Sequence, residues 1–427
     1  MRRSVESVLP FAARRWATLI CLASVTVLAG CGGGSKVKDF NPAKVVALGD
    51  ETSAFETDAA LINVNGTPLR GLLYSVNAVL RSDAVFCAVA FGGADGTECP
   101  SGQTVTPSAT GEFTETGTAT VSVVSQSGVL SKTQGEFDDV PGVTVHALLE
   151  RTYLCSPGLS NYYGNWVQIM ARGFSADRAF GGDQCPQDTG NAVSYAAWGA
   201  QVTDISTQFD QARSQLDSNT LVTVLAGQND IIAAYLTLTA NGTAAANVAD
   251  AEQARQDMAR LGETLAGVVN DIVRTGAKVV VMKVPDLSLS PLVRSTDTAI
   301  TGPAPDQALL RGLVKAFNEG HRNQGGLTLG LTNNGRQIVL VETYYLLDPD
   351  TQAKDVEPAC DPARITSPAG VGPGGFSARQ QLLYCSNESL RTGASIGSYQ
   401  WADPTHLGPL GHAALATVAF SRVNDQL

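Results

Sequence analysis

The sequence predicts a three-layer α/β sandwich built on a parallel sheet. Short runs of mostly apolar, β-branched residues recur along the chain, and amphipathic stretches of helical length separate several of them. Continuous apolar runs indicate strands that are covered on both faces. Strands that alternate with helices favour a parallel sheet with right-handed crossovers. Because ligands of such sheets bind outside the carboxyl ends of the strands, any site is expected at that edge.

The elements are expected in a regular order. Strands are expected at residues 43–49, 220–226, 277–284 and 337–341, and the first of them ends in a glycine that is typical of a functional turn. Helices are expected at residues 202–216, 246–275, 306–323 and 409–423, with a further helix beginning near 165–168. The longest of these helices has an apolar stripe made of Met258, Leu261, Leu265, Val268, Val269 and Ile272.

Two segments interrupt this alternation within a domain expected over residues 43–427. Residues 62–150 are rich in glycine, threonine, serine and valine, with a period of two around Thr118–Ser122. They predict an inserted segment that is mostly β or irregular. Residues 348–400 contain several prolines and a glycine cluster and are expected to be loop-like, a form that often shapes access to a site.

The first 30 residues have the composition of a bacterial lipoprotein signal peptide. Four arginines precede an apolar run over residues 16–29, which is too short to span a bilayer permanently. The run ends in Leu28-Ala29-Gly30-Cys31, which resembles a lipobox whose cysteine is lipidated and becomes the new N-terminus. We expect lipidation at Cys31 and a flexible lipidated linker over 31–42. An ordinary secretory cleavage site is the alternative.

This leader predicts a place in the bacterial cell envelope. A lipid anchor at the N-terminus would be the contact with the membrane, and Gly32 after the cysteine resembles lipoproteins of the outer membrane. The formal net charge is −11 at pH 7, so nucleic acid and anionic lipid head groups are poor partners.

The cysteines predict disulfides. Cys21 lies in the leader and Cys31 at the anchor, which leaves an even set of the kind that pairs in exported proteins. Sequence order favours the pairs Cys87–Cys99, Cys155–Cys185 and Cys360–Cys385, although other pairings are possible. None of these cysteines has the Cys-x-x-Cys spacing of a zinc or redox site, so no metal and no cofactor are predicted.

Four short blocks contain residues suited to acyl transfer. They are Gly49-Asp50-Glu51-Thr52-Ser53, Ala197-Trp198-Gly199, Gly227-Gln228-Asn229-Asp230 and Asp403-Pro404-Thr405-His406. Acyl transfer needs a nucleophile, a base, a group that orients the base and donors for the developing oxyanion. Asn229 and Asp230 could instead cap a helix, and Asp403 and His406 could simply stabilise a loop.

In type and order these blocks resemble those of the SGNH or GDSL hydrolase family. The resemblance covers roughly residues 43–54 and 160–425 and implies the three-layer SGNH-hydrolase-like sandwich. It also implies that His406 is the base and Asp403 its orienter, with Gly199 and Asn229 in the oxyanion hole. The chain departs from the family at the first block, where Glu51 stands in place of the nucleophilic serine.

This departure leaves the activity open. A carboxylate at residue 51 would repel an oxyanion and form an ion pair with His406, which favours the imidazolium and removes the base. Ser53 or Thr52 could serve as a displaced nucleophile, or Glu51 could act as a general base on water. The chain is therefore expected to be either an ester hydrolase, acting on a small-molecule or polymer ester or an acylated glycan, or a silent relative that binds a glycan or acyl ligand.

A third hypothesis assigns the working part to the inserted segment over residues 62–150, as in a structural surface lipoprotein. It leaves the four blocks without a role.

Overall fold

The computed structural model describes the greater part of the chain. It covers residues 40–56, 72–77, 164–174, 180, 191–240, 248–302, 304–332, 336–343, 356–365, 377–386, 389–394 and 399–427, together with the backbone of short strands between 63 and 133. The elements belong to one compact unit, Asn41–Leu427. The predictions for Cys31 and for the pairs Cys87–Cys99 and Cys155–Cys185 lie outside the described residues.

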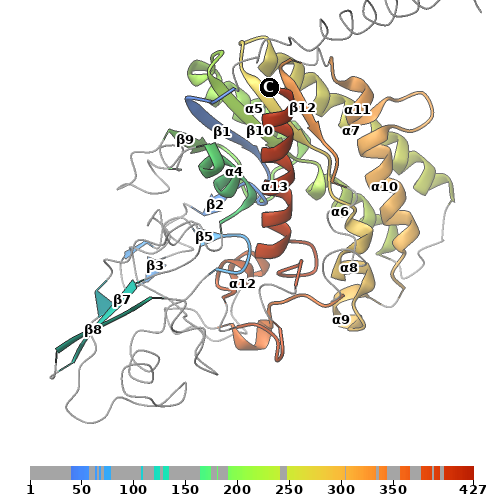
Figure 1. The fold of residues 1–427 in the computed structure, drawn as a ribbon. Helices are drawn as coiled ribbons and strands as arrows, with labels where there is room; N and C mark the ends of the chain where they lie inside the picture. The colour runs from blue at the N-terminus through green and yellow to red at the C-terminus, as the bar shows by residue number, and fades with distance from the viewer. Residues whose placement is uncertain are drawn as a thin grey trace, which may run out of the picture. The chain divides into compact units, whose positions relative to one another are not determined.

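A parallel sheet forms the centre of this unit, as predicted, and it has five strands (Figure 1). Its strand order is β12-β11-β10-β1-β9, and every neighbouring pair runs parallel. The strands are β1 (Lys44–Gly49), β9 (Ala192–Ser194), β10 (Thr220–Leu225), β11 (Lys278–Met282) and β12 (Ile338–Val341). All six residues of β10 are buried, as expected for a central strand that is covered on both faces.

Helices flank the sheet and complete the α/β arrangement. The main helices are α4 (Trp166–Phe174), α5 (Val202–Ala212), α6 (Gln228–Thr239), α7 (Val248–Val273), α10 (Gln307–Glu319) and α13 (Pro409–Gln426). Helices α5 and α7 pack on each other and against β1 and β11 respectively, whereas α13 packs on α4, β11 and β12. Figure 1 shows α13 crossing in front of the strands. None of the described helices is long and apolar enough to span a bilayer.

Beside the sheet, a smaller apolar cluster joins segments that are far apart in the chain. It includes residues from β5 (Leu72–Leu73), which pairs with β2 (Phe55–Glu56), and from α12 (Ala378–Leu383). The predicted Cys360–Cys385 disulfide is present within this cluster, with the two Cα atoms 5.9 Å apart. Segment 359–360 donates backbone hydrogen bonds to Trp401 and Ala402, and so links this cluster to the start of the His406 loop.

Other elements differ from the sequence-based expectation or add to it. Strand β9 and helix α6 were not among the expected elements. β9 has three residues, too few to show a period, and pairing with β1 determines its place. Residues 348–400 contain the helical turns η4 (Pro362–Arg364) and α12 in addition to loops.

Within residues 62–150 the structure has short antiparallel pairs. These join β3 (Asn63–Val64) to β4 (Thr67–Pro68), and β7 (Thr120–Ser125) to both β6 (Pro107–Ser108) and β8 (Gly128–Thr133).

Candidate functional site

The turn after β1 is tight and only glycine fits its first position. Gly49 has φ +147°, and a Cβ there would lie 2.2 Å from the carbonyl oxygen of Leu225 in β10, the neighbouring strand of the sheet. The side chain of Gln208 holds the turn from α5, because it accepts from the Gly49 N–H at 2.7 Å and donates to the Gly49 carbonyl at 2.9 Å. The turn places Glu51 at the carboxyl end of the central strands, where the sequence predicted a site.

The Glu51 carboxylate lies at the centre of the site. Its Oε2 accepts hydrogen bonds from the backbone N–H of Gly199 and from Nδ2 of Asn229, both at 2.9 Å. Its Oε1 lies 3.1 Å from Nε2 of His406. Glu51 is only 2% exposed. The four blocks therefore meet around one side chain, and the expected ion pair between Glu51 and His406 is present.

Asn229 faces this site and does not cap the helix that follows it. It lies in the first turn of α6, after Gly227, and its side-chain amide donates to Glu51 and to the carbonyl of Ala200 at 3.0 Å. The neighbouring Asp230 accepts from the N–H of Val202 at 3.0 Å, at the start of α5. Asn229 thus contributes a donor to the site, while Asp230 stabilises the adjoining helix.

Asp403 orients His406 from the other side. Its Oδ2 lies 2.7 Å from Nδ1 of His406, and its Oδ1 accepts from the backbone N–H groups of Thr405 and His406 at 2.8 and 2.7 Å. The indole of Trp198 stacks on the imidazole, with ring centroids 5.4 Å apart. These contacts hold the imidazole plane, so the nitrogen that faces Glu51 is Nε2.

The charges in the site are strongly coupled. Burial alone would lower the pKa of His406, but the charge and hydrogen bond of Asp403, together with Glu51, raise it to about 10. Burial opposes ionisation of the two carboxyls as well, yet their contacts with His406 hold the pKa of Glu51 and of Asp403 below the ordinary values. At neutral pH His406 is therefore an imidazolium between the carboxylates of Glu51 and Asp403. An imidazolium cannot accept a proton, so His406 cannot act as a base in this state.

Asp50 differs from its neighbour Glu51. It is fully buried, and burial, followed by the charge of Glu51, raises its pKa to about 8. Its Oδ1 accepts from the Thr52 N–H at 3.0 Å, whereas its Oδ2 has no hydrogen-bond partner in the described part of the chain. A neutral carboxyl at pH 7 is therefore expected beside the charged Glu51.

The candidate replacement nucleophiles are buried beneath the turn. Ser53 is 0% exposed, and its hydroxyl oxygen accepts a hydrogen bond of 3.0 Å from Nε1 of Trp166 in α4. Thr52 is also buried. In the described part of the chain, the hydrogen bonds of the His406 ring are to Glu51, Asp403 and the Thr405 hydroxyl. The structure thus places Glu51, and neither Ser53 nor Thr52, against His406.

Sequence reasoning missed the supporting residues Trp166, Gln208 and the stacking role of Trp198. Trp198 lies inside one of the four blocks, so its position beside Gly199 could have indicated that its ring lies in the site. Trp166 and Gln208 lie in helices and reach the turn only through packing. No cluster of metal-ligating side chains occurs within the described ranges.

The comparisons identify a family. A family model described as GDSL-like Lipase/Acylhydrolase matches residues 148–418, which is more than half of the chain. The matched region contains Gly199, Asn229, Asp403 and His406, and it begins after the turn that carries Glu51. A search of curated proteins found no match.

Proposed function

The chain belongs to the GDSL-like lipase/acylhydrolase family, which suggests an esterase or hydrolase, and from this premise we propose that Glu51 keeps its acyl-transfer site closed. In this proposal the protein recognises an acyl ester or an acylated glycan without cleaving it. The observation that supports it is the position of the Glu51 carboxylate, which takes the hydrogen bonds of Gly199, Asn229 and His406 together.

Each of these contacts removes a part of the usual chemistry. Gly199 and Asn229 would donate to a developing oxyanion, but both already donate to an anion of the protein itself. His406 would take the proton of a nucleophile, but its ion pair with Glu51 favours the protonated ring. The carboxylate also stands where a serine hydroxyl would attack. Substitution of one residue would therefore restore nucleophile, base and oxyanion donors at once.

The test is hydrolysis of a short-chain chromogenic ester by the full chain at pH 8. The unmodified chain should be inactive, and Glu51→Ser should raise the rate by about 10²- to 10⁴-fold, the usual contribution of a working acid–base group. The matched controls are Glu51→Gln, which keeps the size of the side chain without a hydroxyl, and Glu51→Ser combined with His406→Ala. Both should be inactive.

Different outcomes would identify the rival mechanisms. Activity of the unmodified chain that is lost in Ser53→Ala would establish a displaced serine and overturn the proposal. Activity of the unmodified chain that survives Ser53→Ala and is lost in Glu51→Gln would instead make Glu51 a general base on water.

We further propose that the protein is lipid-anchored in the bacterial cell envelope, in the outer membrane, through Cys31. The support is the leader, which has the charged start and apolar run of a signal peptide and ends in Leu28-Ala29-Gly30-Cys31, a tetrapeptide that resembles a lipobox. Labelled palmitate should be incorporated into the unmodified chain and not into Cys31→Ser, and only the unmodified chain should sediment with outer membranes. Equal labelling of the two chains would rule out this anchor.

A further inference from the structure

A buried charged cluster lies beside the candidate site and outside the four blocks. It consists of Glu56 in β2, Tyr74 directly after β5 and Arg379 in α12, and it is called the Glu56 cluster below. Oε2 of Glu56 accepts a hydrogen bond from the Tyr74 hydroxyl at 2.6 Å and another from Nε of Arg379 at 2.9 Å. Nη2 of Arg379 lies 2.6 Å from the same oxygen. Glu56 and Tyr74 are buried, whereas the Arg379 side chain is 31% exposed.

The chemistry of the Glu56 cluster suits orientation better than stabilisation. Its surroundings are apolar, since Tyr74 belongs to the small apolar cluster beside the sheet, together with Leu72 and Leu382. A buried ion pair in such surroundings is often no more stabilising than well-packed apolar residues of similar volume. A guanidinium that binds a carboxylate through two nitrogens does, however, fix the geometry of both groups. The Glu56 cluster is therefore expected to orient the side chain that packs on it.

That side chain is the indole of Trp198. The centroid of the Tyr74 ring lies 4.8 Å from the centroid of the indole, and Cζ of Arg379 lies 5.9 Å from it, within the range of a cation–π contact. The same indole stacks on the imidazole of His406, with an angle of 23° between the planes. The residues on either side of Trp198 in the chain are exposed, so the packing of this block rests on the indole. Trp198 thus connects the Glu56 cluster to His406.

We propose that Arg379 and Glu56 are positioning residues for His406 and act through the indole of Trp198. They hold the indole in place, and the indole fixes the imidazole plane in which Nε2 faces residue 51. Asp403 holds the imidazole only at its Nδ1 edge, so a contact on the face of the ring is needed to prevent tilting. This inference rests on the proposed function only where activity is measured.

NMR of the chain with labelled histidine at pH 7 tests the position of His406 directly. Protons above the face of an indole resonate upfield, so the C–H resonances of the His406 ring should lie upfield of an unstacked histidine. Trp198→Leu gives the unstacked position. Glu56→Gln combined with Arg379→Met should move the resonances toward that position, and it removes both charges together, so no unpaired charge stays buried. Arg379→Lys keeps the charge without the planar fork and should move them part of the way.

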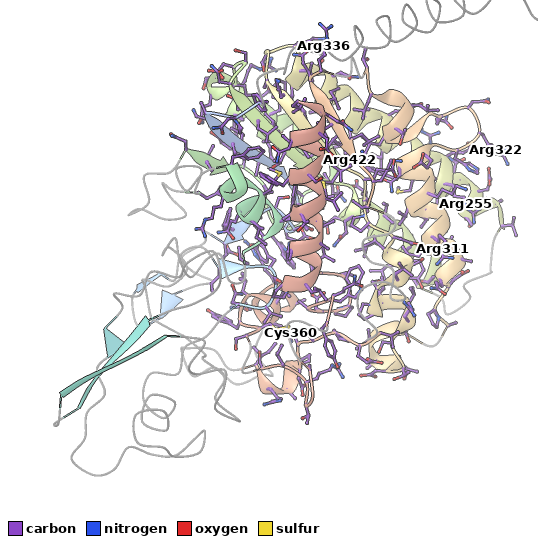
Figure 2. The ribbon with its side chains drawn as sticks, viewed as in Figure 1. Arg255, Arg311, Arg322, Arg336, Cys360 and Arg422 are labelled. Atoms are coloured by element: carbon purple, nitrogen blue, oxygen red, sulfur yellow. A yellow bond between two sulfur atoms is a disulfide. The ribbon has the colours of Figure 1, made fainter. Side chains whose placement is uncertain are left out.

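Activity provides a second measurement. In the Glu51→Ser background, the Glu56→Gln and Arg379→Met pair should lower kcat for a short-chain chromogenic ester by about 10- to 100-fold per folded molecule, because a slightly misplaced base transfers protons poorly. KM should change little. The control is Arg422→Met, an exposed cation on α13 that lies well away from Cys360 in Figure 2. It should leave both kcat and the His406 resonances unchanged.

The outcomes separate this inference from the proposed function. Unmoved His406 resonances in the double variant, with a normal circular dichroism spectrum, would refute the positioning role. If the double variant fails to fold, unmoved resonances in Arg379→Lys would refute it as well. A Glu51→Ser chain without activity would contradict the proposed function alone, and the NMR shifts would then decide this inference.

Discussion

Glu51 and Ser53 lie two residues apart on one turn, yet their side chains meet different partners. Glu51 faces His406, whereas Ser53 points beneath the turn to the indole of Trp166 in α4. Backbone bonds within the turn, from Ser53 to Asp50 and from Ala54 to Glu51, fix this difference. The Ser53 hydroxyl, although only two residues from Glu51 in the sequence, is thus not a hydrogen-bond partner of the His406 ring.

The bond between Ser53 and Trp166 can be tested by a double-mutant cycle. Ser53→Ala leaves the buried indole N–H of Trp166 without its acceptor and should lower the free energy of unfolding by about 1–3 kcal/mol. Trp166→Phe removes the donor, so the double variant should be more stable than the sum of the single effects predicts. Urea unfolding of the unmodified chain, the two single variants and the double variant gives the four free energies that the cycle needs. If the two single effects on the free energy of unfolding simply add up, this bond is contradicted. A separate expectation concerns activity: in the Glu51→Ser background, Ser53→Ala should leave ester hydrolysis intact.

The charge of His406 predicts a pH-dependent stability. Its folded-state pKa of about 10 lies above the ordinary value of 6.5, so the unfolded chain releases the proton first as the pH rises. The stabilisation is complete below pH 6.5 and should fall by up to about 1.4 kcal/mol per pH unit toward pH 10. Glu51→Gln removes one of the two carboxylates, so the pKa of His406 should fall. The loss of stability with rising pH should then end at a lower pH.

This prediction is checked by NMR titration of the imidazole and by urea unfolding between pH 6 and 10. Asp204→Asn, at an exposed carboxylate in the first turn of α5, is the control and should leave the His406 titration unchanged. An imidazole that titrates identically in the unmodified chain and in Glu51→Gln would contradict the ion pair.

At the scale of elements, two glycines of α7 have opposite surroundings. Gly262 faces α10 and the short helix α11 (Gly326–Gly330), and a Cβ there would lie 2.1 Å from the carbonyl oxygen of Phe317 and 2.6 Å from the Leu327 nitrogen. Gly267 is exposed, with no atom of the described residues within 4 Å of an added Cβ. The close packing of α7 on these helices therefore depends on the absence of one side chain.

Alanine substitution should separate the two positions. Gly262→Ala should destabilise the protein by about 1–3 kcal/mol because it overpacks the helix contact. Gly267→Ala should stabilise it by about 0.5–1 kcal/mol, since alanine restricts the unfolded chain and favours the helix. Thermal or urea unfolding of the two variants measures these changes in stability, and each variant serves as the control for the other. A stabilising effect at both positions would mean that α10 and α11 do not pack closely on α7.

At the scale of the whole molecule, segments far apart in the chain support the His406 loop. The hydroxyl of Ser75 donates to the carbonyl of Leu407 at 2.8 Å, and the N–H of Cys360 donates to the carbonyl of Ala402 at 2.9 Å. The Cys360–Cys385 disulfide joins α12 and the neighbouring apolar cluster to that second contact. The position of Asp403 and His406 therefore depends on a covalent link outside the four blocks.

Removal of this disulfide should weaken both the fold and the site. The bond closes a loop with a sequence separation of 25, for which the chain-entropy account gives about 3.5 kcal/mol. Cys360→Ser combined with Cys385→Ser should lower the free energy of urea unfolding by roughly that amount. In the Glu51→Ser background it should also reduce ester hydrolysis. Arg422→Ala is the control, and a double variant as stable as the control would contradict the prediction.

The central strands and the long helices could be predicted because their signals are local. A strand buried on both faces must be apolar throughout, and a helix packed on one side must repeat its apolar residues every three or four positions. The predicted runs at 43–49 and 246–275 accordingly became β1 and α7 with changes of only a few residues at their ends. β9 could not be predicted in this way, because a three-residue strand carries no period and is defined by its pairing with β1.

By itself, the sequence determined the α/β class and the order of the four blocks, and it predicted that Glu51 stands where the family it resembles has a serine. Only the tertiary structure decided what the Glu51 side chain contacts. Its partners Gly199, Asn229 and His406 are 148, 178 and 355 residues away in the chain. They converge because the carboxyl ends of parallel strands meet at one edge of the sheet, and no local pattern encodes the direction in which a side chain leaves a tight turn.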